Sequence, residues 1–181
     1  MNPITYRTAA PDDAATIAAI HTASWRDAYA GILDADFLAG PIEADRLAHW
    51  ASALAAPPPG QLLQVAVEGD GRAVGFICAH HLQDPRWGSW VDNLHIVPGM
   101  RGRKIGEGLL RRAADLLLQR GPDTGLFLWV FEANTAGLRF YERLGGRVVE
   151  TTPSRIPAAN GKPSLRVHWP SLTTLLQAPW R

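Results

Sequence analysis

Residues 96–106 read IVPGMRGRKIG: a short apolar run, a proline turn and a loop rich in glycine and arginine. The loop runs directly into a segment with the apolar spacing of an amphipathic helix, formed by Ile105, Leu109, Ala113, Leu116 and Leu117. The first turn of such a helix exposes unpaired backbone N–H groups and the positive end of the helix dipole. The stretch therefore predicts a strand, an anion-binding loop and a helix, in that order.

The composition of this loop suits a diphosphate. Gly102 and Gly106 keep side chains out of its approach, and Arg101, Arg103 and Lys104 add positive charge. The P-loop pattern is absent, because Gly106 is followed by Glu107 and not by lysine. The dinucleotide-binding pattern also fails, because the loop follows the fourth predicted strand instead of an early one. A plain tight turn remains the alternative.

The elements on either side of the loop predict a mixed α/β sheet without internal repeats. Strand-like runs occupy residues 4–8, 62–68, 73–80, 90–97, 126–131, 148–151 and 165–169. Helical patterns begin near residues 11, 41, 105 and 134, and Gly31, the prolines at 57–59, Gly121 and Gly145 end them. The nearly unbroken apolar run 126–131 is typical of a strand covered on both faces.

The composition bounds the kind of protein. A chain of 181 residues with 46% apolar residues predicts one domain, 1–181, with 171–181 as a C-terminal tail. A formal net charge of +1 gives no support for nucleic-acid binding, and no apolar run approaches the roughly 20 residues that span a bilayer. No signal-peptide pattern opens the chain, so we expect a cytoplasmic protein. Cys78 is the only cysteine and is interpreted as inert core. No His, Asp and Glu set shows metal-ligand spacing, so the sequence predicts no metal.

A second motif follows the next strand. It reads Asn134-x-x-Gly137-x-x-Phe140-Tyr141-x-x-x-Gly145-Gly146. Together with Arg101-Gly102-Arg103-Lys104-Ile105-Gly106, it resembles the two coenzyme-A-binding signatures of the GNAT superfamily of acetyl-CoA-dependent N-acetyltransferases. Lys104 stands where the family pattern has its first glycine, Gly137 replaces an alanine and Gly146 an aromatic residue. The order of elements also matches, so the resemblance covers essentially all of 1–170.

The resemblance implies the GNAT fold, a central mixed, mostly antiparallel sheet of about seven strands flanked by about four helices. It implies transfer of the acetyl group of acetyl-CoA to a primary amine of a small molecule or peptide, by direct attack in a ternary complex. The alternative is a non-catalytic acyl-CoA-binding domain that senses or regulates. A homodimer is compatible with this class, and no nucleic-acid or membrane partner is expected.

The resemblance also assigns site residues. The cofactor-binding residues are expected to be Leu94, His95, Ile96, Arg101, Gly102, Arg103, Lys104, Ile105, Gly106, Glu107, Asn134 and Tyr141, with a splayed strand near Leu94–Ile96. Tyr141 is expected to protonate the departing thiolate, and a core aromatic is the alternative. Asn134 is expected to bind the pantetheine arm, to cap its helix, or both.

The general base is less defined. The position of the base glutamate in histone-acetylating relatives corresponds to Trp90, which cannot accept a proton. Asp92 lies two residues nearer the cofactor on the same face of a regular strand, so it is the predicted base, with a raised pKa beside Trp90. His95 would need a bulge to reach that cleft, and a water relay is the other alternative. Trp25, Tyr29, Trp87 and Trp90 are the candidates for acceptor binding.

Overall fold

The computed structural model describes residues 3–179 and forms one seven-stranded sheet in the order β1-β2-β3-β4-β5-β7-β6. The strands are β1 (Ile4–Thr8), β2 (Gln61–Glu68), β3 (Ala73–Asp84), β4 (Gly88–Ile96), β5 (Leu126–Phe131), β6 (Arg147–Pro153) and β7 (Pro163–Trp169). Every neighbouring pair is antiparallel except β4 and β5, which run parallel. The predicted mixed, mostly antiparallel sheet is confirmed.

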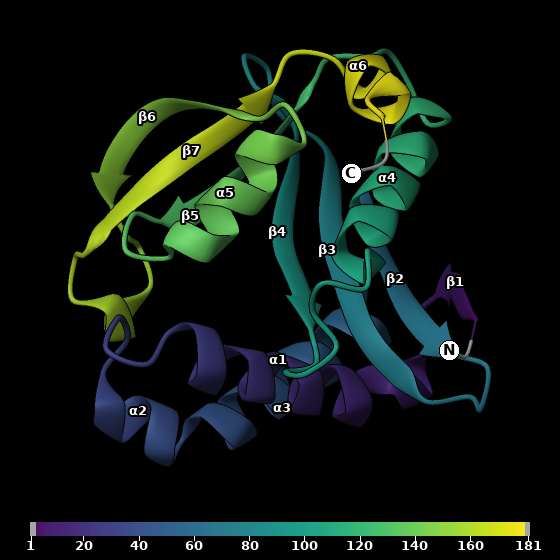
Figure 1. Cartoon of the computed structure of the whole chain (residues 1–181). Helices are drawn as coiled ribbons and strands as arrows, with labels where there is room; N and C mark the ends of the chain where they lie inside the picture. Colours follow the sequence, from purple (N-terminus) through teal and green to yellow (C-terminus); the bar gives the residue numbers. More distant parts are fainter. Residues whose placement is uncertain (1–2, 180–181) are drawn as a thin grey trace.

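Helices cover both faces of the sheet (Figure 1). They are α1 (Ala14–Ala28), α2 (Ala35–Ala39), α3 (Ile42–Ala55), α4 (Ile105–Leu118), α5 (Thr135–Arg143) and α6 (Leu172–Gln177). The first three lie on one face, and α4, α5 and α6 lie on the other. Four of them correspond to the predicted helices. The short helices α2 and α6 were not predicted.

Strand alternation divides the core between the two faces. Phe76 and Cys78 of β3 pack towards α1 and α3, whereas Ile77 and Ala79 of the same strand pack towards α4. The run that became β5 is apolar throughout because it too is covered on both sides, as the sequence predicted. This packing fixes which β4 and β5 residues can face a site between the two strands.

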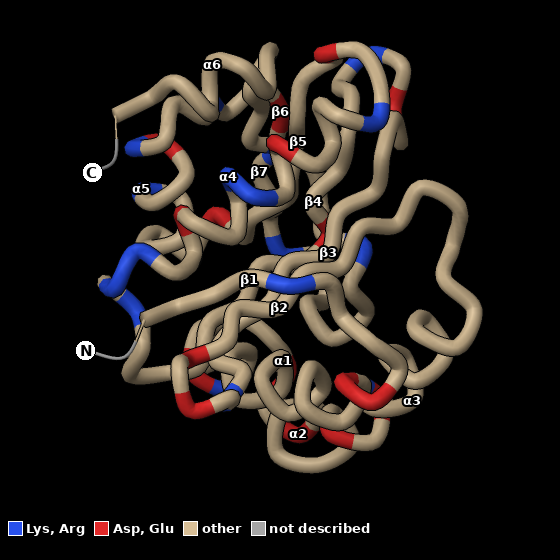
Figure 2. The backbone as a smooth tube through the Cα atoms, turned by 90° about the vertical axis from the view of Figure 1, so that its right-hand side faces the viewer, with Lys and Arg blue, Asp and Glu red and all other residues tan. Residues whose placement is uncertain are grey.

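The segment predicted as a C-terminal tail contains α6, which packs on α4. Arg111 of α4 forms an ion pair with Glu107 at 2.8 Å and donates to the carbonyl oxygens of Leu175, Leu176 and Ala178. Acidic and basic residues are spread over many elements, in keeping with the small net charge (Figure 2). Within residues 3–179, no helix has the length and apolar character needed to cross a membrane.

A close backbone contact starts the parallel pairing of β4 and β5. Gly88 has φ +82°, and a Cβ placed on it would lie 2.4 Å from the carbonyl oxygens of both Thr124 and Gly125. The next residue, Ser89, donates its N–H to the Gly125 oxygen at 3.1 Å. A side chain at 88 would therefore separate the turn before β4 from the turn before β5.

We expect Gly88→Ala to lower the free energy of unfolding by at least about 2 kcal/mol, because left-handed strain adds to the backbone clash. Gly71→Ala is the matched control, because Gly71 has φ +89° but open space around its Cβ position. That control should lose about 1 kcal/mol from strain alone. Urea unfolding of both variants measures the difference, and equal losses would refute the role of the contact.

Candidate active site

The site begins where β4 and β5 separate. Their pairing ends at Val91 and Leu128, after which β4 continues along β3 while β5 continues along β7. The register of β4 against β3 shifts at the same place: Val91 pairs with Ala79 and Asn93 with Cys78, so Asp92 is an extra residue. A β-bulge bends and twists its strand. The bulge therefore accounts for the divergence, and it was not predicted.

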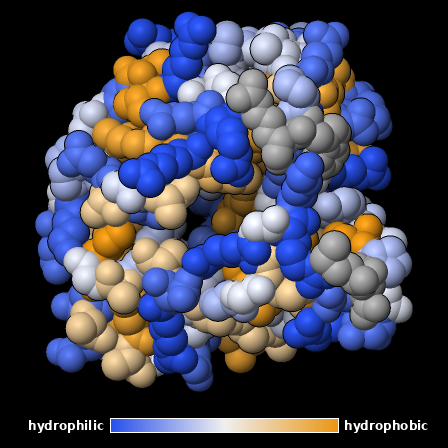
Figure 3. Space-filling model, in the orientation of Figure 1, coloured by the Kyte–Doolittle hydropathy of each residue, from blue (hydrophilic) through white to orange (hydrophobic). Residues whose placement is uncertain are grey.

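A cavity of about 890 Å³ occupies the opening between the strands. Leu94, His95 and Ile96 line it from β4, and Trp129 and Val130 line it from β5. Figure 3 shows this face of the molecule hollowed beside α5. The predicted splayed strand near Leu94–Ile96 thus coincides with the cavity wall.

The start of α4 forms one end of this cavity. Arg101, Gly102, Lys104, Ile105, Gly106 and Glu107 all line it. Gly106 has an ordinary backbone, and a Cβ there would touch the Phe140 ring at 3.4 Å, so its missing side chain keeps the helix N-terminus open. The α4 N-terminus lacks a side-chain cap, which leaves its N–H groups available to an anion.

The backbone conformation of Lys104 is the one that the glycine of the family pattern would adopt. Its φ of 61° and ψ of 8° are left-handed, a conformation that glycine adopts without steric cost. The glycine of the pattern is thus replaced by a residue that keeps its backbone shape. The surrounding structure bears the strain, which costs roughly 1–2 kcal/mol for a residue with a Cβ.

The arginines of the loop have different partners. Arg101 forms an ion pair with Asp27 of α1, and both residues line the cavity. Arg103 does not line it; its guanidinium lies 3.1 Å from the Glu68 carboxylate on β2. Arg101 is therefore the arginine of the loop that faces the cavity, and the prediction that Arg103 binds the cofactor is not supported by its position.

The second motif lines the same cavity through α5. Asn134 caps this helix, accepting from the Gly137 N–H at 3.1 Å, and it also lines the cavity. A Cβ on Gly137 would lie 2.6 Å from the Asn134 amide nitrogen, so the glycine leaves room for the cap. At Gly146, the other position where glycine departs from the family pattern, Trp169 occupies the space of the missing side chain. A Cβ on Gly146 would lie 2.6 Å from the Trp169 indole ring.

Tyr141 lies on the cavity wall, in the last turn of α5. Its ring packs edge-on against Phe140 and Trp169, with centroids 5.1 and 6.1 Å away. Burial, and then the neighbouring Tyr29, raise the pKa of its hydroxyl above the usual value near 10. Tyr141 therefore carries its proton at neutral pH. Its position combines a packed ring with access to the cavity.

His95 lies on the cavity wall but its nitrogens are engaged. Trp25 donates its indole N–H to Nε2 at 3.3 Å, so the ring proton is on Nδ1, 3.0 Å from the Ser24 oxygen. Burial, followed by the charges of Arg101 and Arg46, lowers the pKa of His95 to about 3. His95 is therefore neutral, with its basic lone pair already used. The bulge that would bring it to this side of the strand is present.

The predicted acceptor-binding residues are not all brought together. Tyr29 lines the cavity, and burial raises the pKa of its hydroxyl to about 12. Trp25 is buried behind His95. Trp90 stacks on His80 with centroids 5.4 Å apart, and Trp87 packs against Arg86 and Arg166; neither tryptophan lines the cavity. Sequence reasoning gave no role to several residues that line the cavity: Ser24, Asp27, Met100, Trp129 and Arg143.

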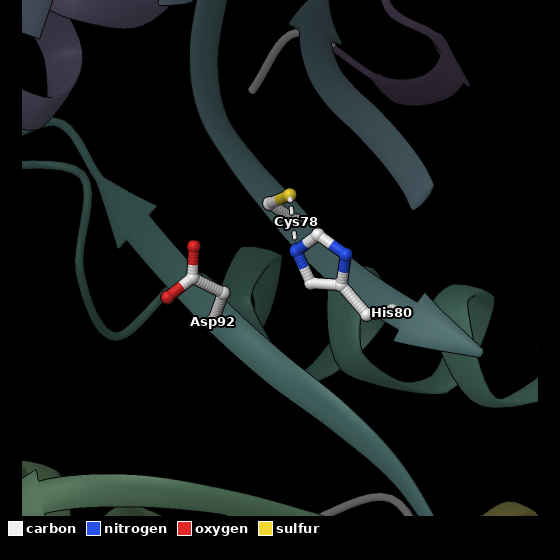
Figure 4. A group of neighbouring side chains, drawn as sticks. All are labelled: Cys78, His80 and Asp92. Carbon is white, nitrogen blue, oxygen red and sulfur yellow. Dashed lines mark hydrogen bonds between the residues drawn. The ribbon is translucent and has the colours of Figure 1, made fainter. Parts of the chain in front are cut away.

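Asp92 also lies outside the cavity lining, on the bulge of β4 beside Cys78 and His80 (Figure 4). Burial raises the pKa of its carboxyl to about 6, partly offset by Arg46 and by a hydrogen bond from Asn93. This is the direction expected beside Trp90. Its role as general base stays a prediction.

Comparisons with known proteins agree with this geometry. Residues 17–146 match the model of the Acetyltransferase (GNAT) family. The streptothricin acetyltransferase of Streptomyces lavendulae is 34% identical over 83 residues, which are 45% of this chain and 42% of that protein. The alignment thus spans less than half of this curated relative.

Solved structures match over almost the whole chain. The PaiA N-acetyltransferase of Thermoplasma acidophilum, in complex with coenzyme A, has a TM-score of 0.71 at 20% identity and covers 92% of this chain and 99% of its own. A GCN5-related N-acetyltransferase of Rhodopseudomonas palustris has a TM-score of 0.71 at 25% identity, and the match covers 93% of this chain and 96% of that protein.

The open α4 N-terminus yields a direct test. Gly106→Glu places bulk and negative charge where backbone N–H groups face the cavity, so we expect at least tenfold weaker binding of acetyl-CoA by calorimetry. Gln119→Glu is the control, because it adds the same charge at the far end of α4 and should bind normally. Equal affinities of the two variants, both folded, would overturn the assignment of this loop.

Proposed function

The chain belongs to the acetyltransferase (GNAT) family, and from that premise we propose that it transfers the acetyl group of acetyl-CoA to a primary amine of a small molecule or peptide. The observation that carries this proposal is one cavity lined together by an open helix N-terminus, two diverging strands and Tyr141. These three features suit, in turn, a diphosphate, an extended amide-containing arm and a thioester. Coenzyme A in a neighbouring structure with the same fold supports the choice of donor.

At one end of the cavity, the proposed role of the α4 N-terminus is to hold the diphosphate. Gly102 and Gly106 permit close approach, and Arg101 supplies charge once Asp27 gives up its ion pair. Glu107 also faces the cavity, but Arg111 neutralises it. The net field at this end therefore favours an anion.

The proposed role of the unpaired edge of β4 is to bind the cofactor and to polarise the acetyl carbonyl. Leu94, His95 and Ile96 pair with β3 but not with β5, so the β5-facing edge of β4 has backbone groups to offer. In the proposal they bind the pantetheine arm together with Asn134 and stabilise negative charge on the acetyl oxygen as the amine attacks. Loss of one such preorganised donor costs about 3 kcal/mol of transition-state stabilisation.

In the proposal, Tyr141 gives its proton to the departing sulfur. When bound, acetyl-CoA supplies the acetyl group as an activated thioester. The raised pKa of Tyr141 keeps the hydroxyl protonated at neutral pH, so a proton is available beside the departing sulfur. His95 is unsuited to take the proton of the amine, because Trp25 occupies its lone pair, so in the proposal a water relay carries that proton to solvent.

The proposal is tested by release of free thiol from acetyl-CoA with a panel of small amines, amino acids and peptides. We expect amine-dependent thiol release that Gly106→Glu abolishes at limiting acetyl-CoA. Tight acetyl-CoA binding without release for any amine would instead favour the non-catalytic acyl-CoA-binding alternative.

Tyr141→Phe should lower kcat by roughly 10²–10⁴-fold, because the general acid is lost while the packed ring remains. Acetyl-CoA affinity and thermal stability should stay close to those of the parent. Tyr6→Phe is the control, because Tyr6 lies on β1, outside the cavity lining, and its kcat should not change. A parallel loss of stability and activity in Tyr141→Phe would favour a purely packing role.

A further inference from the structure

A mixed set of donor atoms lies between β3 and β4, outside the cavity. Cys78 and His80 are two residues apart on β3, so strand alternation puts both on the face towards α1 and α3. The bulged residue Asp92 of β4 reaches the same space (Figure 4). One donor atom from each side chain lies within 4.8 Å of the other two, and Cys78 Sγ is 3.8 Å from His80 Nε2.

These three side chains have few other partners. Among residues 3–179, the side chains of Cys78 and His80 are hydrogen-bonded only to each other, and the Asp92 carboxylate accepts only from the Asn93 side chain. No ion pair within 4.0 Å joins Asp92 to a basic residue in that range, although the charge of Arg46 acts on it from α3. A carboxylate so placed beside a thiol and an imidazole lacks the cation that would satisfy it.

We propose that Cys78, His80 and Asp92 bind a divalent metal ion of the zinc type, with a water molecule in the fourth position. Zinc bonds of about 2.3 Å to sulfur and 2.0 Å to nitrogen in a tetrahedron separate the two donors by about 3.5 Å. The observed 3.8 Å is close to that value. The donor atoms lie within 4.8 Å of one another, so the carboxylate oxygen must approach by at most about 1.5 Å.

The donor set selects the metal. A thiolate with an imidazole favours zinc and similar transition metals over magnesium and calcium, which prefer all-oxygen sites. When the ion binds, the Cys78 thiol releases its proton to solvent and the thiolate takes its place as the ligand. The ligand set then carries two negative charges, which balance those of the ion.

Residues around the donors already orient them. Asn93 donates to Asp92 Oδ2 at 2.8 Å, and the Trp90 ring stacks on the His80 imidazole with centroids 5.4 Å apart. Such outer contacts are characteristic of metal sites, where they fix the orientation of each ligand. Trp90, a candidate for acceptor binding from sequence, thus supports a ligand instead.

The ion would join β3 to β4 across the bulge where β4 leaves β5. It would stabilise the divergence that opens the cavity without contacting the cavity lining. While the ion is bound, Asp92 cannot also accept a proton from an amine. The metal site and the predicted base role of Asp92 therefore exclude each other.

The test titrates Co²⁺ into the full chain after dialysis against a chelator. We expect one equivalent to bind with a near-ultraviolet sulfur-to-cobalt charge-transfer band, which Zn²⁺ displaces. Because Cys78 is the only cysteine, the band identifies Cys78 as the sulfur ligand of the metal. Cys78→Ser should abolish the band, and His80→Gln and Asp92→Asn should each weaken binding at least about tenfold.

His81→Gln is the matched control, because His81 follows on the same strand with its side chain towards Gly60 and Gly121, and it should bind Co²⁺ like the parent. Circular dichroism confirms that each variant is folded. Absence of the band in the parent, or an unchanged band in folded His80→Gln and Asp92→Asn, would overturn the proposal. Neither result bears on acetyl-CoA binding or thiol release, which are measured separately.

Discussion

The structure depends on the point where β4 and β5 stop pairing. Up to Val91 and Leu128 the two strands form an ordinary parallel ladder, fixed at its start by the close contact at Gly88. Beyond that point each strand retains only its outer neighbour. Unpaired backbone groups are costly in a dry core, so a sheet that opens in its middle needs something to satisfy them. A cavity that admits a polar, extended molecule meets that need.

The signals that sequence reasoning read correctly are local. A helix N-terminus can be recognised from the glycines and basic residues that surround it, because the chemistry and the backbone are specified within a few positions. The same holds for Asn134, whose capping follows from its place before α5. Residues 101–106 and 134–141 could therefore be placed together before any three-dimensional information.

What could not be predicted depends on neighbours distant in sequence. Arg103 looks like a phosphate ligand by composition, yet Glu68 from β2 draws it away. Trp90 and Asp92 do lie on the same side of β4, beside His80, but beyond the bulge the strand turns away and neither residue lines the cavity. Cys78 and His80 are two residues apart, a spacing that places two side chains on one face of a strand and not of a helix. Asp92 comes near them only through the register of β4 against β3, which the sequence does not show.

The hydrogen bonds from Arg111 of α4 to the carbonyl oxygens of α6 affect the N-terminal end of α4 as well. Glu107 is among the residues that line a cavity proposed for an anion, and its carboxylate is paired with Arg111. The Arg111 guanidinium is in turn held by carbonyl groups of residues 175–178. The last helical turn of the chain thereby governs the electrostatic potential of a loop far earlier in the sequence. Shortening the chain by a few residues would alter anion affinity without touching the binding loop.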